Sequence, residues 1–316
     1  MEKVDHRVNE AFVEMFGSAR VISEAPLAPL TTFRAGGSAD WLIEAHDDEE
    51  IVRVLGVSAG LGVEVTVLGG GSNVLIGEQG VRGLILRIRH GDIELVQPGV
   101  VRVQGGVTLN GLVRWTVNRG WAGLERWAGT PGTVGGGLHG NAHFQGGLLG
   151  EHVIRICAVD RQGVERVISG EEMEFSYDAS RLQGTREVVL WAEFSVSEFE
   201  PALLRAKARE SLAYRKRTQP LAVPSAGCVF RNPHQVESLP EGVPCSAGAL
   251  IDRAGLKGRS VGHATVSQVH GNFIVSDGHA KPTDVRQLIE LCRAEVERKF
   301  GVLLQDEIIY LGEFDT

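Results

Sequence analysis

Residues 1–20, 108–119, 199–220 and 284–300 each predict a helix. In the first, second and fourth of these segments, apolar residues recur on one face at the spacing of an amphipathic helix. Gly120 directly follows the second segment and is typical of a helix end. The third segment becomes basic towards its end and stops at a proline, so we interpret it as the link between two domains.

Shorter apolar runs between these helices predict strands. We expect strands at residues 40–45, 81–88, 100–106, 153–159, 164–168, 187–197 and 302–311. Asp47 precedes a further amphipathic segment and has Glu50 three residues later, a pattern that predicts a helix N-cap. Residues 63–73 begin as a strand and run into a glycine turn, whereas residues 129–150 are too rich in glycine to be regular throughout.

Composition places the chain among ordinary globular proteins of about two domains. It has 316 residues, a net charge of −8 and a pI near 5.7, which argues weakly against a general nucleic-acid binder. The four cysteines include no C-x-x-C pair, so we expect neither a disulfide framework nor a zinc site, and we expect a cytoplasmic protein. No signal peptide and no membrane-spanning apolar run are visible.

Glycine is the unusual component. The chain has 41 glycines, nearly twice the average share of about 7%. They cluster in one loop at 69–73, with the sequence GGGSN, and in a second at 128–137, with the sequence AGTPGTVGGG. Such loops can hold a phosphate against backbone N–H groups, although either loop taken alone is more often a tight turn without a ligand. Neither has the spacing of a Rossmann fingerprint or a P-loop.

The order of eight motifs resembles one family. These motifs are TTFRAGGSAD (31–40), VLGGGSNVLI (67–76), GLERWAGTPGTVGGGLHGNA (123–142), YRKRTQP (214–220), PSAGCVFRNP (224–233), AGALIDRAGLKG (247–258), VSQVHGNFIVSDG (266–278) and LLQDEIIYLG (303–312). Together they resemble UDP-N-acetylenolpyruvoylglucosamine reductase, the MurB family, over roughly residues 25–312. The chain is similar to the shorter class of that family.

The resemblance implies an α+β fold, with an FAD-binding domain of the vanillyl-alcohol-oxidase (PCMH) type and a smaller α/β substrate domain. The implied boundaries are 1–200 for the FAD-binding domain, which the strand at 302–316 would rejoin, and 201–301 for the substrate domain. The implied reaction is NADPH-dependent reduction of UDP-N-acetylglucosamine enolpyruvate to UDP-N-acetylmuramate, for peptidoglycan synthesis, with non-covalent FAD. The implied FAD contacts are Gly69, Gly70, Gly71, Ser72, Asn73, Gly132, Thr133, Val134, Gly135, Gly136 and Asn141.

Two residues match the family's acid groups. Cys228 stands at the proton-donor position, where the family usually has serine. A thiol with a pKa of about 8.5 is mostly neutral at pH 7 and is a better acid than an alcohol. The alternative is a small buried hydrophobe, the usual state of a free cysteine. Glu307 matches the catalytic glutamate, which a developing anion would keep protonated, and its alternative is an outward-facing strand residue.

The third catalytic position departs from the family. In its Y-R-x-S pattern an arginine follows the tyrosine, whereas here Asp178 follows Tyr177. Arg181 is the candidate for the missing cation, and a structural ion pair, for example with Asp178, is an equal alternative. A second departure is at residues 143–145, where the family commonly has Gly-Ala-Tyr. His143 lies four residues after a histidine, but no third ligand is visible and we expect no metal site.

Basic and amide side chains outside the glycine loops would meet the UDP-sugar, because guanidinium groups suit phosphate oxygens and an amide suits a base edge. The candidates are Arg215, Arg217, Arg231, Asn232 and Lys257. A solvated surface charge is the alternative for each of them. For the whole chain, the alternatives are another oxidoreductase of the same flavoprotein type or a catalytically impaired paralogue. We expect a monomer with no nucleic-acid or membrane partner.

Overall fold

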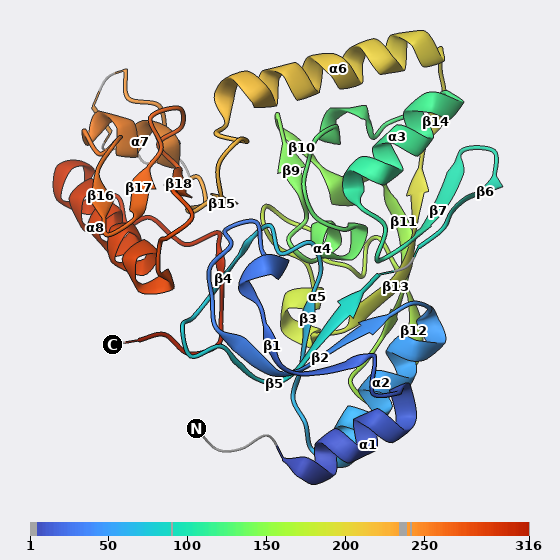
Figure 1. The fold of residues 1–316 in the computed structure, drawn as a ribbon. Helices are drawn as coiled ribbons and strands as arrows, with labels where there is room; N and C mark the ends of the chain where they lie inside the picture. Colours follow the sequence, from blue (N-terminus) through green and yellow to red (C-terminus); the bar gives the residue numbers. More distant parts are fainter. Residues whose placement is uncertain (1–4, 90, 234–238, 241, 316) are drawn as a thin grey trace. The chain divides into compact units, whose positions relative to one another are not determined.

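A computed structural model describes residues 5–89, 91–233, 239–240 and 242–315 (Figure 1). The chain forms two compact units. Unit 1 contains Met1–Glu24, Asp40–Gly70 and Gly83–Tyr214, and unit 2 contains Ala25–Ala39, Gly71–Arg82 and Arg215–Thr316. The predicted functional domains, divided at residue 200, stay a prediction, since the compact units instead divide this part of the chain after Tyr214.

The first part of unit 1 is built on a four-stranded sheet in the order β1-β2-β5-β3. The strands are β1 (Val21–Pro26), β2 (Ser38–Ala45), β5 (Val81–Ile88) and β3 (Val65–Leu68), and the helices that contribute to its core are α1 (His6–Phe16) and α2 (Asp48–Leu61). Strands β3 and β5 are parallel. Asp47 caps α2, accepting a hydrogen bond of 2.7 Å from the backbone N–H of Glu50, as predicted.

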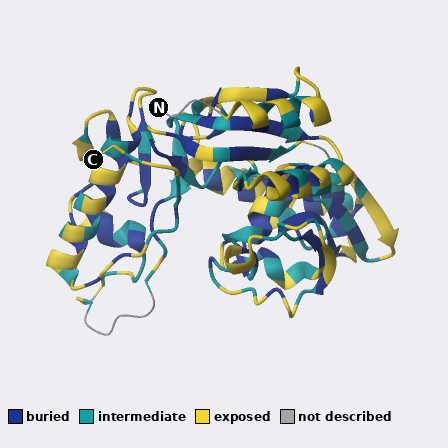
Figure 2. Cartoon of the chain, turned by 90° about the horizontal axis from the view of Figure 1, so that it is seen from below, coloured by how far each residue is buried: buried dark blue, intermediate teal, exposed yellow. Residues whose placement is uncertain are grey.

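The second part of unit 1 is an antiparallel sheet in the order β12-β11-β13-β7-β6. Its strands are β12 (Glu165–Ser169), β11 (Val153–Val159), β13 (Val188–Ser195), β7 (Val100–Gln104) and β6 (Ile93–Gln97). Helices α3 (Leu109–Arg119) and α4 (Val134–His139) contribute to the core of this sheet. Figure 2 shows buried residues gathered along the strands and exposed residues on the outer faces of helices.

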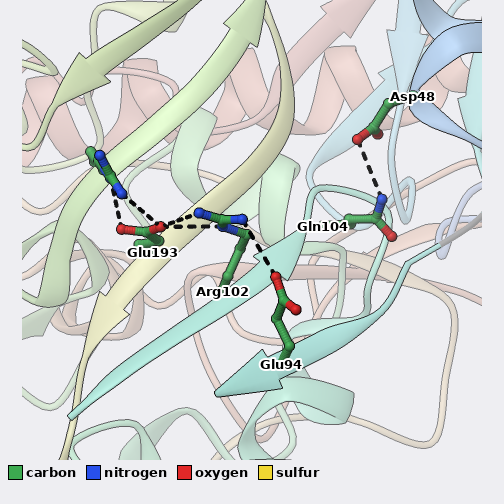
Figure 3. A network of polar contacts seen from close by, with 6 residues as sticks. Asp48, Glu94, Arg102, Gln104 and Glu193 are labelled. Carbon is green, nitrogen blue, oxygen red and sulfur yellow. Dashed lines mark hydrogen bonds and ion pairs between the residues drawn. The ribbon is translucent and has the colours of Figure 1, made fainter. Parts of the chain in front are cut away.

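A buried carboxylate ties three strands of this sheet together (Figure 3). Glu193 of β13 lies directly opposite Arg102 of β7 on one side and Arg155 of β11 on the other. Its oxygens lie 2.7 Å from a nitrogen of each guanidinium. The hydrogen bond from Arg155, followed by that from Arg102, lowers the pKa of Glu193 although burial opposes the shift. This pairing makes a charged residue tolerable at a position that is only 3% exposed.

Unit 2 has an antiparallel sheet in the order β15-β18-β17-β16 and a parallel pair of short strands. The sheet strands are β15 (Ser225–Cys228), β18 (Phe273–Ser276), β17 (Ala264–Val266) and β16 (Ser260–Val261), and the pair is β4 (Val74–Ile76) with β19 (Ile309–Leu311). Helix α8 (Pro282–Phe300) packs on β16 and β17 and also contacts α7 (Ala247–Arg253).

The remaining elements are short, apart from the 18-residue helix α6 (Pro201–Thr218). The short elements are η1 (Ala28–Leu30), β8 (Trp121–Ala122), η2 (Glu125–Trp127), β9 (His143–Phe144), β10 (Gly147–Leu148), η3 (Leu149–His152), α5 (Leu182–Thr185) and β14 (Ser197–Glu198). Among the described residues, no helix is both long and apolar enough to cross a membrane.

The sequence predicts the bounds of the helix α3 closely, whereas the predicted last strand is longer than the observed one. The helix predicted at 108–119 is α3, which Thr108 caps and which ends at Gly120 in the left-handed region with φ +79°. The strand predicted at 302–311 is regular only in β19. The reason is that the preceding residues form isolated backbone bonds with residues 229–231 rather than a continuous ladder.

Candidate active site

The two glycine loops predicted from the sequence pack against each other in unit 1. A Cβ added to Gly70 would lie 2.6 Å from the Cα of Gly132, and one added to Gly69 would lie 2.6 Å from the Oγ1 of Thr133. Carbon atoms in ordinary contact lie about 3.5–4.0 Å apart. Side chains at these two positions would therefore push the loops apart, which explains why both are glycine.

Backbone N–H groups at this contact are available to a ligand. Within the described part of the chain, the N–H groups of Gly70, Gly132 and Thr133 donate to no acceptor. Grouped N–H donors of this kind bind phosphate oxygens, so the loops fit a pyrophosphate. Three further residues predicted to bind the cofactor, Val134, Gly135 and Gly136, donate their N–H groups to acceptors within the chain. Contact of these three residues with FAD stays a prediction and would use other atoms.

The first loop continues into unit 2. Gly71 has a φ of +61°, and a Cβ there would overlap the carbonyl oxygen of Leu30. The N–H groups of Gly71, Ser72 and Asn73 donate to no acceptor among the described residues. The side-chain amide of Asn73 donates to the backbone carbonyl of Glu307 at 3.1 Å. This turn therefore presents N–H groups and also positions the backbone of a predicted catalytic residue.

Cys228 and Glu307 lie on adjacent segments of unit 2. Residue 228 ends β15, and the carbonyl of the next residue, Val229, accepts a hydrogen bond of 2.8 Å from the N–H of Glu307. The N–H of Arg231 donates to Gln305 across the same pair of segments. Both predicted acid residues are half-buried. Because main-chain bonds fix their segments, the fold brings together two residues that are 79 positions apart in the sequence.

A buried guanidinium acts on the same thiol. Arg215 is 5% exposed, and burial lowers its pKa to about 10, while the negative charge of the Cys228 thiolate opposes that shift. A nearby cation stabilises the thiolate that remains after a cysteine has given up its proton. The structure thus adds an electrostatic relation between these residues that the sequence motif did not contain.

The side chain of Asn141 is buried and forms hydrogen bonds to main-chain groups. It is fully buried, its Nδ2 donates to the carbonyl of Ser176 at 2.7 Å, and its Oδ1 accepts from the N–H of Gly150 at 2.8 Å. These bonds explain the asparagine by local geometry, including its φ of +44°. Its predicted contact with FAD stays a prediction.

Arg181 forms a structural ion pair, the alternative to a catalytic role, but its partner is Glu187 and not Asp178. Its Nε and Nη2 donate to the carboxylate of Glu187 at 3.1 and 3.2 Å. Asp178 is instead paired with His143, with 2.9 Å between Oδ1 and Nδ1. A catalytic role for Arg181 stays a prediction.

Comparison with known proteins covers both parts of the chain. Residues 39–169 match an FAD-binding domain, and residues 219–311 match the C-terminal domain of UDP-N-acetylenolpyruvoylglucosamine reductase. The reductase of Acaryochloris marina is 37% identical over 94% of this chain and 95% of its own length. A second reductase, from Symbiobacterium thermophilum, is 40% identical over 93% of this chain and 92% of its own. The chain belongs to the UDP-N-acetylenolpyruvoylglucosamine reductase (MurB) family.

A solved MurB structure has the same fold. The enzyme of Thermus caldophilus matches with a TM-score of 0.76 and 30% identity, over 92% of this chain and 98% of that one. The α+β fold, with its FAD-binding domain of the vanillyl-alcohol-oxidase type and its MurB C-terminal domain, is therefore confirmed.

Two departures from the MurB pattern prove to be partners. His143 and Asp178 are each unusual in the sequence, but no local pattern joins them. A signal was present, because a basic residue and an acidic one both replace the expected types in one chain. Their contact is a feature of the candidate site that the sequence alone does not reveal.

The residues predicted to contact the UDP-sugar lie in unit 2 and differ in their exposure and in the intramolecular contacts that they form. Arg217 is exposed and Arg231 is half-buried. The Oδ1 of Asn232 accepts from the N–H of Ala247, at the start of α7. Lys257 pairs with Asp252 at 2.7 Å. Asn232 and Lys257 thus have structural roles on this surface, and substrate contact stays a prediction for every residue of this set.

Proposed function

We propose that this chain reduces UDP-N-acetylglucosamine enolpyruvate to UDP-N-acetylmuramate with electrons from NADPH, as an FAD-dependent enzyme of peptidoglycan precursor synthesis. Membership of the MurB family over more than nine-tenths of the chain supports the reaction. The observation that carries the assignment to residues is that Cys228 and Glu307 lie on segments joined by main-chain hydrogen bonds. FAD, when bound, supplies the hydride that it has taken from NADPH.

The glycine loops would hold FAD. The N–H groups of Gly70, Gly132 and Thr133, and those of Gly71, Ser72 and Asn73, would donate to its pyrophosphate and neighbouring oxygens. Binding through backbone N–H groups needs close approach, which glycine permits. Non-covalent attachment follows the habit of the family.

Cys228 would supply the proton. After hydride addition to the methylene carbon, the neighbouring carbon becomes an enolate-like anion, which the thiol of Cys228 protonates. The thiolate left behind is stabilised by the buried Arg215. A serine at this position would donate less readily because an alcohol is the weaker acid.

Glu307 would stabilise the developing anion. A protonated carboxyl group placed beside the substrate carboxylate donates a hydrogen bond where an ionised one would repel. The UDP-sugar would be held by Arg215, Arg217, Arg231, Asn232 and Lys257, with arginine forks on the phosphate oxygens. We also propose that the enzyme acts in the cytoplasm, because its four cysteines are free. We expect it to act as a monomer.

Turnover tests the proposal directly. The purified protein, loaded with FAD, should oxidise NADPH only when UDP-N-acetylglucosamine enolpyruvate is added. Cys228→Ala and Glu307→Ala should bind FAD normally and lose turnover, whereas Cys228→Ser should retain activity. Unchanged turnover in both alanine variants would refute the roles assigned to these residues. Oxygen-dependent turnover of a simple alcohol or sugar would instead indicate another flavoprotein oxidoreductase, and FAD binding without turnover an impaired paralogue.

A further inference from the structure

The side chain of Asp178 is an unusual element of unit 1. It is buried, with 8% of the side chain exposed, and its backbone is in the left-handed region with φ +53°. Oδ1 lies 2.9 Å from Nδ1 of His143. Oδ2 is also buried and has no hydrogen-bond partner among the residues that the structure describes. A buried carboxylate oxygen without a donor is unfavourable, so Oδ2 has the capacity to accept a further hydrogen bond.

Asp178 fixes the orientation of His143. Nδ1 must carry the hydrogen to donate to the carboxylate, which sets the tautomer of the ring. The ring of Tyr177 lies 4.6 Å from that of His143, centroid to centroid, and restricts its tilt. The imidazole is therefore a positioned group, and in its doubly protonated form it can donate a hydrogen bond from each ring nitrogen.

We propose that His143, held by Asp178, supplies the positive charge and hydrogen-bond donor for the enolpyruvyl carboxylate that an arginine at position 178 would otherwise supply. This inference rests on the proposed function. Asp178 occupies the arginine position of the Y-R-x-S pattern, so the substitution removes a cation where one is expected. Its partner, His143, belongs to the second departure, at residues 143–145. One ion pair thus joins a residue of each departure.

Within this arrangement the two residues act differently. His143 is the catalytic residue, since it touches the substrate carboxylate. Asp178 is a positioning residue that acts through the imidazole, and its orphan oxygen Oδ2 is filled by a substrate hydroxyl or a water molecule when substrate binds.

The test compares single and double variants in two measurements, turnover of the enolpyruvyl substrate and reduction of the flavin by NADPH. His143→Gln and Asp178→Asn keep the size of the side chains, and we expect each to stay folded and FAD-loaded. We expect kcat/KM for the enolpyruvyl substrate to fall about 100-fold in His143→Gln, the loss typical of removing one donor to a developing anion. We expect the rate of flavin reduction by NADPH to stay unchanged, which a general structural defect would not produce.

Rescue makes the test specific. His143→Gly should be impaired, and adding Asp178→Arg, which restores the family residues at both positions, should return the kcat/KM. A purely structural ion pair would not be rescued, because the pair is absent from both variants. The matched control is His263→Gln, which breaks an exposed pair of 2.7 Å with Asp277 and should leave the kcat/KM unchanged.

One result would overturn the inference, namely wild-type kcat/KM in folded, FAD-loaded His143→Gln. If Arg181→Gln then shows a loss, the charge is assigned to Arg181 instead. If the wild-type protein itself fails to turn over the enolpyruvyl substrate, the proposed function fails, and this outcome is distinct from the first.

Discussion

Replacing Gly70 with alanine tests the contact between the glycine loops. The added Cβ would lie 2.6 Å from the Cα of Gly132, a backbone atom that no side-chain rotation can move away. Restoring ordinary contact requires the loops to separate by about 1 Å. Overpacking of this size costs about 1–3 kcal/mol. The free protein can relax by opening the loops, whereas bound FAD requires their N–H groups at the original spacing.

The free-energy cost of the added methyl group in Gly70→Ala should therefore appear mainly as weaker binding of FAD. We expect the dissociation constant for FAD to rise about 5- to 150-fold, which corresponds to 1–3 kcal/mol. Titration of the apoprotein with FAD, followed by flavin fluorescence, measures it, and thermal unfolding of the apoprotein reports any loss of stability.

Gly140→Ala is the matched control. A Cβ at Gly140 meets nothing within 4 Å and the residue has a φ of −94°, so this variant should bind FAD as the wild type does. If Gly70→Ala also kept the wild-type affinity and the wild-type melting temperature, the argument that close loop packing shapes the FAD site would be wrong.

Three further predictions concern stability, and urea unfolding measures each of them. Gly56→Ala, inside α2 with open space around the new Cβ, should raise the free energy of unfolding by about 0.5–1 kcal/mol, and an unchanged or lower value would contradict the helix argument. Glu193→Ala should lower it by about 2–4 kcal/mol because two arginines lose their shared partner; a neutral result would mean that solvent replaces the pair. The hydrogen bond from Arg20 lowers the pKa of Glu50 to about 2, against an ordinary value of about 4.3. The ionised carboxylate therefore contributes up to about 3 kcal/mol to the free energy of unfolding above pH 4.5, and this contribution is lost as the pH falls towards 2. Arg20→Gln should flatten that decline, and an unchanged slope would show that other groups cause it.

The order of motifs along the chain was sufficient for the family, the fold class and the cofactor. Helix ends were also readable, because capping depends on residues close in sequence, as Asp47 and Gly120 show. The short strands β15 to β18 were not predicted. Each is two to four residues long and is defined by its neighbours in the sheet rather than by its own periodicity.

Local sequence thus determined where helices begin and end, which loops could approach a phosphate, and which side chains have the right chemistry for acid catalysis. Only the tertiary structure decided which residues meet. It joined the segments of Cys228 and Glu307 through backbone hydrogen bonds, and it paired Arg181 with Glu187 and Asp178 with His143. The physical reason is that the charge of a side chain is a property of the residue, whereas its partner is fixed by long-range packing that no local pattern encodes.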